Sequence, residues 1–151
     1  MKNLSCCFLQ RAIFFAPDEL RHCCLRYFHD GKMKGDVRIF PVNSDRDFSL
    51  KKVIAEKQDI IEKINRGEVT DCLGCPLLTS QEWLGVEDER FDLLSIENNT
   101  CCNMRCSYCS EIYYGGKIAG YNILSCLEEI INNDKVADDL QISWGGGEPT
   151  M

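Results

Sequence analysis

The feature that most constrains the fold is the order of patterns between residues 91 and 147. An apolar run at 91–96 fits a buried strand, and a cysteine-rich loop follows it directly. Apolar side chains at helical spacing come next, and "LQISW" at 140–144 indicates another strand, which ends in three glycines. Two strands joined by a helix should pair in parallel. Because loops that follow parallel strands meet at one edge of the sheet, we expect the cysteines and the glycines to lie together.

The first half of the chain predicts a small α+β region. Apolar and branched residues favour a strand near residues 7–15 and a second one near 36–40. From Ser49 to Gly67 the apolar side chains recur three and four apart, which is one face of a helix. We expect Ser49 to cap this helix and Gly67 to end it.

Cysteine is unusually frequent, with 11 in 151 residues, and an odd number cannot all pair in disulfides within one chain. Gln10 and Arg11 interrupt the apolar N-terminus, so it does not resemble a secretory signal. No stretch approaches the ~18 apolar residues of a membrane span. We therefore expect a reducing cytoplasm, where clustered thiols bind metal more often than they form disulfides. The formal net charge of −7 argues against nucleic-acid binding.

The cysteine loop, residues 97–109, contains the densest group of thiols. Cys102, Cys106 and Cys109 form the pattern C-x3-C-x2-C, which can direct three thiolates at one metal centre. Structural zinc normally takes four ligands, whereas an iron–sulfur cluster held by three cysteines leaves one iron open. We expect Cys101 to be a core residue at the end of the strand.

The glycine turn, Gly145–Gly147, is followed by Glu148 and Pro149. Glycines let a ligand approach the backbone closely, and Glu148 adds an acceptor suited to an ammonium group. A run of glycines alone is usually only a tight turn. Its place after a strand, downstream of the cysteine loop, makes it informative.

Together, "CNMRCSYC" at 102–109 and "GGEP" at 146–149 resemble the motifs of the radical S-adenosylmethionine (radical SAM) superfamily. The resemblance implies that Cys102, Cys106 and Cys109 hold a 4Fe–4S cluster, whose open iron binds the methionine part of SAM. It also implies an enzyme that reductively cleaves SAM to a 5′-deoxyadenosyl radical. A one-electron reductant such as flavodoxin or ferredoxin would be its partner.

The same resemblance implies the residues that contact SAM. Tyr108 matches the aromatic position near the adenine, and Gly146, Gly147 and Glu148 match the turn that meets the SAM amino group. The implied fold is α/β, a partial (β/α) barrel of the TIM type. The chain would supply only its first βα units, in residues 86–151, so we expect a truncated barrel that is not competent alone.

The region at 1–85 contains a second group of cysteines. Cys72 and Cys75 form a C-x2-C pattern, a recurrent element of zinc and iron–sulfur sites, which one or both of Cys23 and Cys24 could complete. The composition loosely resembles the SPASM and twitch auxiliary-cluster modules of peptide-modifying radical SAM enzymes, although those usually follow the barrel. Buried reduced thiols are the alternative.

The remaining candidates have simpler interpretations. We expect Cys6, Cys7 and Cys126 to be core residues, and His22 and His29 to be ordinary surface or loop residues. Two other functional classes stay open beside a radical SAM enzyme acting on a peptide or protein. These are a non-catalytic iron–sulfur electron-transfer protein and a zinc-stabilised binding module. Neither alternative needs the glycine turn.

Overall fold

The computed structural model describes residues 2–107 and 116–147 of the chain. Its centre is a five-stranded mixed sheet of order β6-β3-β2-β8-β9. Strands β2, β8 and β9 run parallel to one another, whereas β3 and β6 are antiparallel to their neighbours. The strands of this sheet are β2 (Ala12–Phe15), β3 (Glu19–Arg21), β6 (Arg38–Pro41), β8 (Phe91–Ile96) and β9 (Val136–Trp144).

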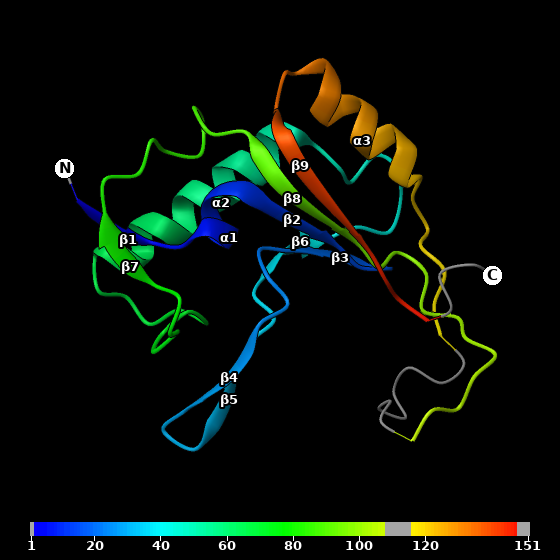
Figure 1. Ribbon diagram of the computed structural model, residues 1–151, viewed down its shortest axis with the longest axis horizontal. Helices are drawn as coiled ribbons and strands as arrows, with labels where there is room; N and C mark the ends of the chain where they lie inside the picture. The colour runs from blue at the N-terminus through cyan, green and yellow to red at the C-terminus, as the bar shows by residue number, and fades with distance from the viewer. Residues whose placement is uncertain (1, 108–115, 148–151) are drawn as a thin grey trace.

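Two small antiparallel pairs and three helices complete the described fold. The hairpin of β4 and β5 projects away from the central sheet, and β1 pairs with β7 on the side where the N-terminus lies (Figure 1). The pairs are β1 (Asn3–Ser5) with β7 (Thr79–Gln81) and β4 (Arg26–His29) with β5 (Lys32–Gly35), and the helices are α1 (Cys7–Arg11), α2 (Leu50–Asn65) and α3 (Ile123–Asn132).

The predicted order of strand, cysteine loop, helix, strand and glycine turn is confirmed. Strand β8 has the predicted bounds, α3 follows it, and β9 pairs with β8 in parallel. The described residues form a mixed α/β fold whose central sheet does not close into a barrel. This sheet contains strands from both sides of residue 85, so regions 1–85 and 86–151 share it.

The prediction of one strand near residues 7–15 is wrong in its first half. Residues Cys7–Arg11 form the short helix α1, and only Ala12–Phe15 is extended. The backbone N–H of Gln10 donates to the carbonyl of Cys6, and the Gln10 side chain donates to the Ser5 hydroxyl at 3.0 Å. The first hydrogen bond closes a helical turn, and the second gives the amide nitrogen of the buried Gln10 side chain a partner.

Helix α2 begins after Ser49, as predicted, but the Ser49 side chain makes no capping hydrogen bond. The backbone N–H of Leu50 instead donates to Glu129 Oε1 on α3 at 2.8 Å. A free amide at a helix start needs an acceptor, and here the acceptor comes from another helix. This contact ties α2 to α3.

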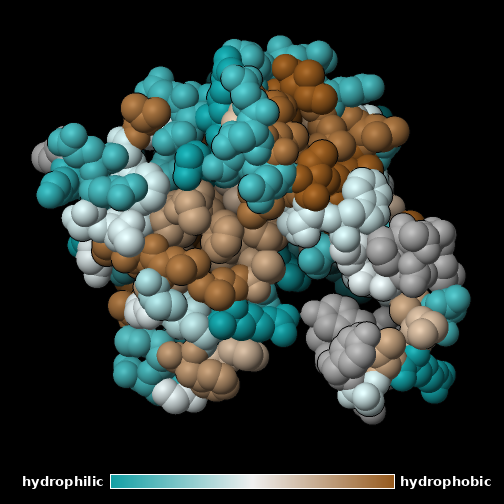
Figure 2. Space-filling model, in the orientation of Figure 1, coloured by the Kyte–Doolittle hydropathy of each residue, from teal (hydrophilic) through white to brown (hydrophobic). Residues whose placement is uncertain are grey.

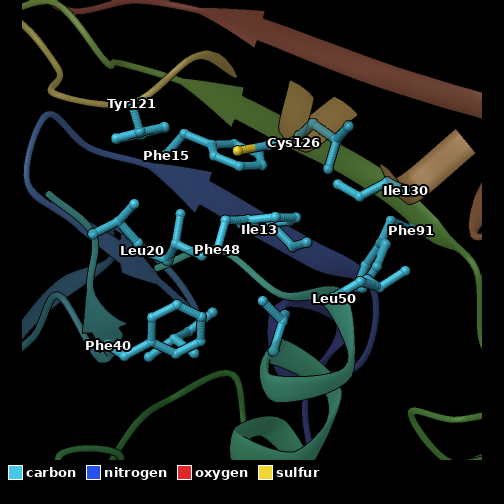
Figure 3. Close-up of a cluster of buried hydrophobic side chains, with 14 of the residues drawn as sticks. Ile13, Phe15, Leu20, Phe40, Phe48, Leu50, Phe91, Tyr121, Cys126 and Ile130 are labelled. Carbon is cyan, nitrogen blue, oxygen red and sulfur yellow. The ribbon is translucent and has the colours of Figure 1, made fainter. Parts of the chain in front are cut away.

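One apolar core joins the sheet to both long helices (Figure 3). Ile13 and Phe15 of β2 pack with Leu50 of α2 and with Cys126 and Ile130 of α3, and all five are buried. The prediction that Cys126 is a core residue is confirmed. Its burial beside β2 shows that the two halves of the chain fold around a common core.

Strand β9 is the edge of the central sheet and exposes apolar side chains. Ile142 and Trp144 on β9 and Leu124 and Ile131 on α3 are all more than half exposed. Figure 2 shows hydrophobic surface on the α3 side of the molecule. Within the described ranges, none of the helices has the length and apolarity needed to span a bilayer.

Candidate metal centres

The cysteine loop and the glycine turn lie at one edge of the sheet, as the parallel pairing predicts (Figure 1). They follow β8 and β9 at the carboxyl ends of both strands. The backbone N–H of Gly145 donates to the carbonyl of Ile96 at 2.9 Å, and the N–H of Glu97 donates to the carbonyl of Phe15 at 2.8 Å. The backbone hydrogen bonds between neighbouring strands therefore continue past the strand ends into the loops.

The glycine turn packs directly against the start of the cysteine loop. The N–H of Gly147 donates to the carbonyl of Asn99 at 3.1 Å. A Cβ atom on Gly147 would overlap the carbonyl oxygen of Cys101, and one on Gly146 would overlap that of Asn99. Gly146 also has a φ of 113°, which other residues rarely adopt. Only glycines allow the two segments to approach so closely.

The cysteine loop is anchored on its other side by the chain that returns from it. Thr100 N donates to the Lys117 carbonyl at 2.8 Å, and Lys117 N donates to the Thr100 hydroxyl at 2.7 Å. Ala119 N bonds the carbonyl of Asn98 at 2.9 Å. The Lys117 ammonium also donates to Asp18 at 2.6 Å, just beyond β2. The start of the loop and the returning chain at 117–119 are thus held against each other at the carboxyl edge of the sheet.

The described cysteines of the loop are half-buried. The N–H of Met104 donates to the Cys102 sulfur at 3.3 Å, the kind of hydrogen bond that stabilises a metal-bound thiolate. Cys106 is also half-buried. Cys101, predicted to be a core residue, is only half-buried, and its N–H donates to the Asn99 side chain at 2.9 Å.

Three predicted site residues, Tyr108, Cys109 and Glu148, lie outside the described residues. Within residues 2–107 and 116–147, no three His, Cys, Asp or Glu side chains stand at the separations that hold a metal ion. A trio that includes Cys109 falls outside that range. The residue types present are those an iron–sulfur cluster requires.

Of the four cysteines in the predicted upstream site, three line one cavity. Cys23, Cys72 and Cys75 line a small cavity of about 10 Å³, together with Cys6. Cys24 does not line this cavity and is exposed. Of the adjacent pair, only Cys23 therefore faces the cavity. We name Cys6, Cys23, Cys72 and Cys75 the thiol cluster.

The thiols of the cluster act on one another electrostatically. Burial raises the pKa of Cys72 to about 12, and negative charge on Cys23, Cys6 and Cys75 adds to the rise. Burial likewise raises the pKa of Cys6 and of Cys23. Cys6, Cys23 and Cys72 therefore hold their protons at neutral pH.

Two predictions about neighbouring residues are wrong. Cys7, predicted to be in the core, is exposed, because α1 turns it away from the side that buries Cys6. His22, predicted to be a surface or loop residue, is buried, and burial lowers the pKa of its imidazole well below 6.5. His29 is half-buried and packs against the backbone at Gly74.

The sequence interpretation also missed Lys57, which is fully buried beside the thiol cluster. Its ammonium donates to the carbonyls of Phe8 and Leu9, each at 3.1 Å. The sequence did contain a feature that predicts this burial, because Lys57 falls on the apolar face of the predicted helix. A lysine at such a position points its charge into the core.

Comparisons with protein-family models, with curated proteins and with solved structures found no match to this chain. The fold and its sites define an α/β protein with two groups of cysteines, one at the carboxyl ends of the parallel strands of a mixed sheet and one inside the N-terminal half.

Proposed function

We propose that this chain is part of a radical SAM enzyme and binds a 4Fe–4S cluster and SAM at the carboxyl edge of its sheet. The observation that carries the proposal is the packing of the glycine turn against Asn99–Cys101, at the start of the cysteine loop. A cofactor held by both motifs needs them side by side. Parallel β8 and β9 provide that placement.

Cys102, Cys106 and Cys109 would hold the cluster. Tyr108, Gly146, Gly147 and Glu148 would contact SAM. When bound, the cluster and SAM supply reductive cleavage of SAM to methionine and a 5′-deoxyadenosyl radical, with flavodoxin or ferredoxin as electron donor.

The described residues have a positioning role in this proposal. Gly146 and Gly147 have no side chains to shield the backbone beside the cysteine loop, so a ligand can approach this backbone closely. The N–H of Met104 supports charge on the Cys102 sulfur, and Lys117 anchors the returning chain. The half-exposed cysteines leave room for a ligand other than a thiolate.

The proposal includes two further expectations. The protein would work in a reducing cytoplasm, because its thiols must stay reduced to bind metal. Its substrate would be a peptide or protein, by the loose likeness of the upstream cysteines to auxiliary-cluster modules. An iron–sulfur electron-transfer protein or a zinc module would not need the close approach that Gly147 makes to Cys101.

The test is electron paramagnetic resonance of the full chain, reconstituted with iron and sulfide without oxygen and then reduced. We expect a cluster signal that shifts when SAM is added, because SAM would bind the open iron. Cys106→Ala should lose the signal. Cys101→Ala is the matched control, since Cys101 lies in the same loop and is also half-buried, and it should keep both the signal and its shift.

Two results would overturn the proposal. A cluster signal that does not respond to SAM would indicate an electron-transfer protein. Zinc without iron at the cysteine loop would indicate a structural metal module. Iron, sulfide and zinc are measured on the same samples, so these outcomes are separated.

A further inference from the structure

Three separate segments bring the thiol cluster together. Cys6 lies between β1 and α1, Cys23 follows β3, and Cys72 and Cys75 lie in the turn that precedes β7. The pairing of Ser5 with Thr79 in β1 and β7 holds the first segment beside that turn. All four side chains line the same cavity of about 10 Å³.

The turn at 72–75 is built as a tight C-x2-C knuckle. The N–H of Cys75 donates to the carbonyl of Cys72 at 3.0 Å, and Gly74 adopts a φ of +75°. A side chain at Gly74 would overlap the His29 ring. Knuckles of this kind present two thiols on one side of a turn, which is how most structural zinc sites supply their ligands.

A tyrosine from the hairpin holds this knuckle in place. The hydroxyl of Tyr27 lies 2.8 Å from the carbonyl of Asp71 and 3.1 Å from that of Leu73. Both carbonyls flank Cys72. Tyr27 also lines the cavity, so the hairpin strand β4 forms one of its walls.

Backbone amides donate hydrogen bonds to the sulfurs of Cys6 and Cys23, the two cluster members outside the knuckle. The N–H of Leu9 donates to the Cys6 sulfur at 3.5 Å. Burial raises the pKa of Cys23, and backbone hydrogen bonds with Val37 and Leu25 oppose the rise. Hydrogen bonds of this type stabilise charge on a thiolate, which an apolar core alone would not do.

Lys57 brings its amino group to the same place. Its side chain is fully buried, and its Nζ donates to the carbonyls of Phe8 and Leu9, shortly after Cys6 in the chain. Burial lowers the pKa of this amino group to about 7, and negative charge on Cys6 and Cys23 opposes that shift. A buried ammonium is costly unless negative charge lies near it. Four thiolates around a divalent ion carry a net charge of about −2, so such a site would offset the charge of Lys57.

We propose that Cys6, Cys23, Cys72 and Cys75 bind a single zinc ion as a closed four-thiolate site that stabilises the N-terminal half. The cavity is only about large enough for one water molecule, so a single ion needs less rearrangement than a cluster of four irons and four sulfides. Since no three of these thiols already stand at ligating separations, binding draws them inward and releases their protons to solvent.

The competing interpretation is that these thiols are reduced core residues. Cys6 and Cys72 do pack with Leu9 and Val37 in a small apolar cluster. The two interpretations differ in their dependence on individual thiols. A core residue tolerates replacement by alanine without any change in metal content, whereas a four-thiolate site loses its ion.

The chain offers matched controls, because two cluster members are each adjacent to an exposed cysteine. Cys7 follows Cys6, and Cys24 follows Cys23, and neither lines the cavity. The experiment uses the full chain with Cys102, Cys106 and Cys109 replaced by alanine, so that zinc at the cysteine loop does not contribute. Zinc per chain is measured after reduction, addition of zinc and gel filtration.

We expect about one zinc per chain in this background. Cys6→Ala and Cys23→Ala should each lose it, and Cys7→Ala and Cys24→Ala should each keep it. Cys75→Ala changes a half-buried position of the knuckle, where misfolding is less of a concern than at the buried Cys6 or Cys72, and it should also lose zinc. Cobalt in place of zinc should give the visible absorption of tetrahedral four-thiolate coordination.

Three results would overturn the inference. They are no zinc in the parent background, zinc retained in folded Cys75→Ala, and zinc lost equally in Cys24→Ala. Iron and sulfide bound in place of zinc would overturn the single-ion assignment. The radical SAM proposal is tested at other residues and by another signal, so either can fail without the other.

Discussion

The thiol cluster and the cysteine loop contain similar residues in opposite settings. The cluster draws Cys6, Cys23 and a C-x2-C knuckle from three segments and surrounds them with apolar side chains. The loop carries its thiols in one short stretch, and those among the described residues, Cys101, Cys102 and Cys106, are half-exposed at the edge of the sheet. Structural metal sites are closed, and catalytic ones keep an open position. Burial distinguishes the two groups in part, because Cys6 and Cys72 are buried, whereas the described cysteines of the loop are all half-buried.

The largest effect should come from the packing around the thiol cluster. Leu9 is buried and lines the cavity, so Leu9→Ala should lower the free energy of unfolding by about 2–5 kcal/mol. Leu124→Ala on α3 removes the same atoms from an exposed position and should cost less than about 0.5 kcal/mol. Urea denaturation followed by circular dichroism measures both. Equal costs would show that the cluster is not part of a packed core.

A smaller effect is expected where the glycine turn meets the cysteine loop. Gly147→Ala places a Cβ against the carbonyl of Cys101, and relieving that overlap should cost about 1–3 kcal/mol and weaken the response to SAM. Gly145→Ala meets only the end of the Glu97 side chain, at 3.3 Å, and should be tolerated. Denaturation and electron paramagnetic resonance are measured on both variants. Equal stability and an equal response to SAM in the two variants would contradict the importance of this contact.

The burial of the thiols predicts a pH dependence in metal-free protein. The pKa of Cys72 rises from 9.0 to about 12 on folding, mainly through burial. The folded state then keeps a proton that the unfolded state releases, so stability falls as pH rises from about 9 to about 12. Cys126 shows a similar rise.

Zinc separates these two contributions to the alkaline loss of stability. Zinc should remove the part due to Cys72, which becomes a thiolate ligand, and leave the part due to Cys126. Unfolding measured against pH, with and without zinc, in Cys72→Ala and Cys126→Ala checks this. A zinc effect that persists unchanged in Cys72→Ala would contradict it.

The smallest effect concerns the anchor of the cysteine loop. The ion pair of Lys117 with Asp18 is mostly exposed, so Lys117→Met should lower the free energy of unfolding by no more than about 1 kcal/mol. The loss should be smaller at high salt, because salt screens exposed charges. The hydrogen bond from Lys117 lowers the pKa of Asp18, so the contribution should vanish as pH falls through that pKa. Lys32→Met on the hairpin is the control. A loss of several kcal/mol would mean that the loop depends on this pair.

Local patterns allowed much of the second half to be predicted. The apolar run of β8, the periodicity of α3 and the strand before the glycines each depend on neighbours in the chain, and all three are present in the structure. The parallel pairing followed from a general rule about helical crossovers. The first half was harder, because α1 is too short to show a period and Glu129 caps α2 from a distant helix.

The sequence by itself determined the spacing of Cys102, Cys106 and Cys109, the glycine turn and the order of elements that brings them to one edge. Only the tertiary structure decided that Cys6 rather than Cys24 joins Cys23, Cys72 and Cys75, and that Lys57 lies beside them. The reason is physical. Spacing and periodicity describe contacts between chain neighbours, whereas the side of the backbone on which a thiol is buried depends on segments that meet only after folding.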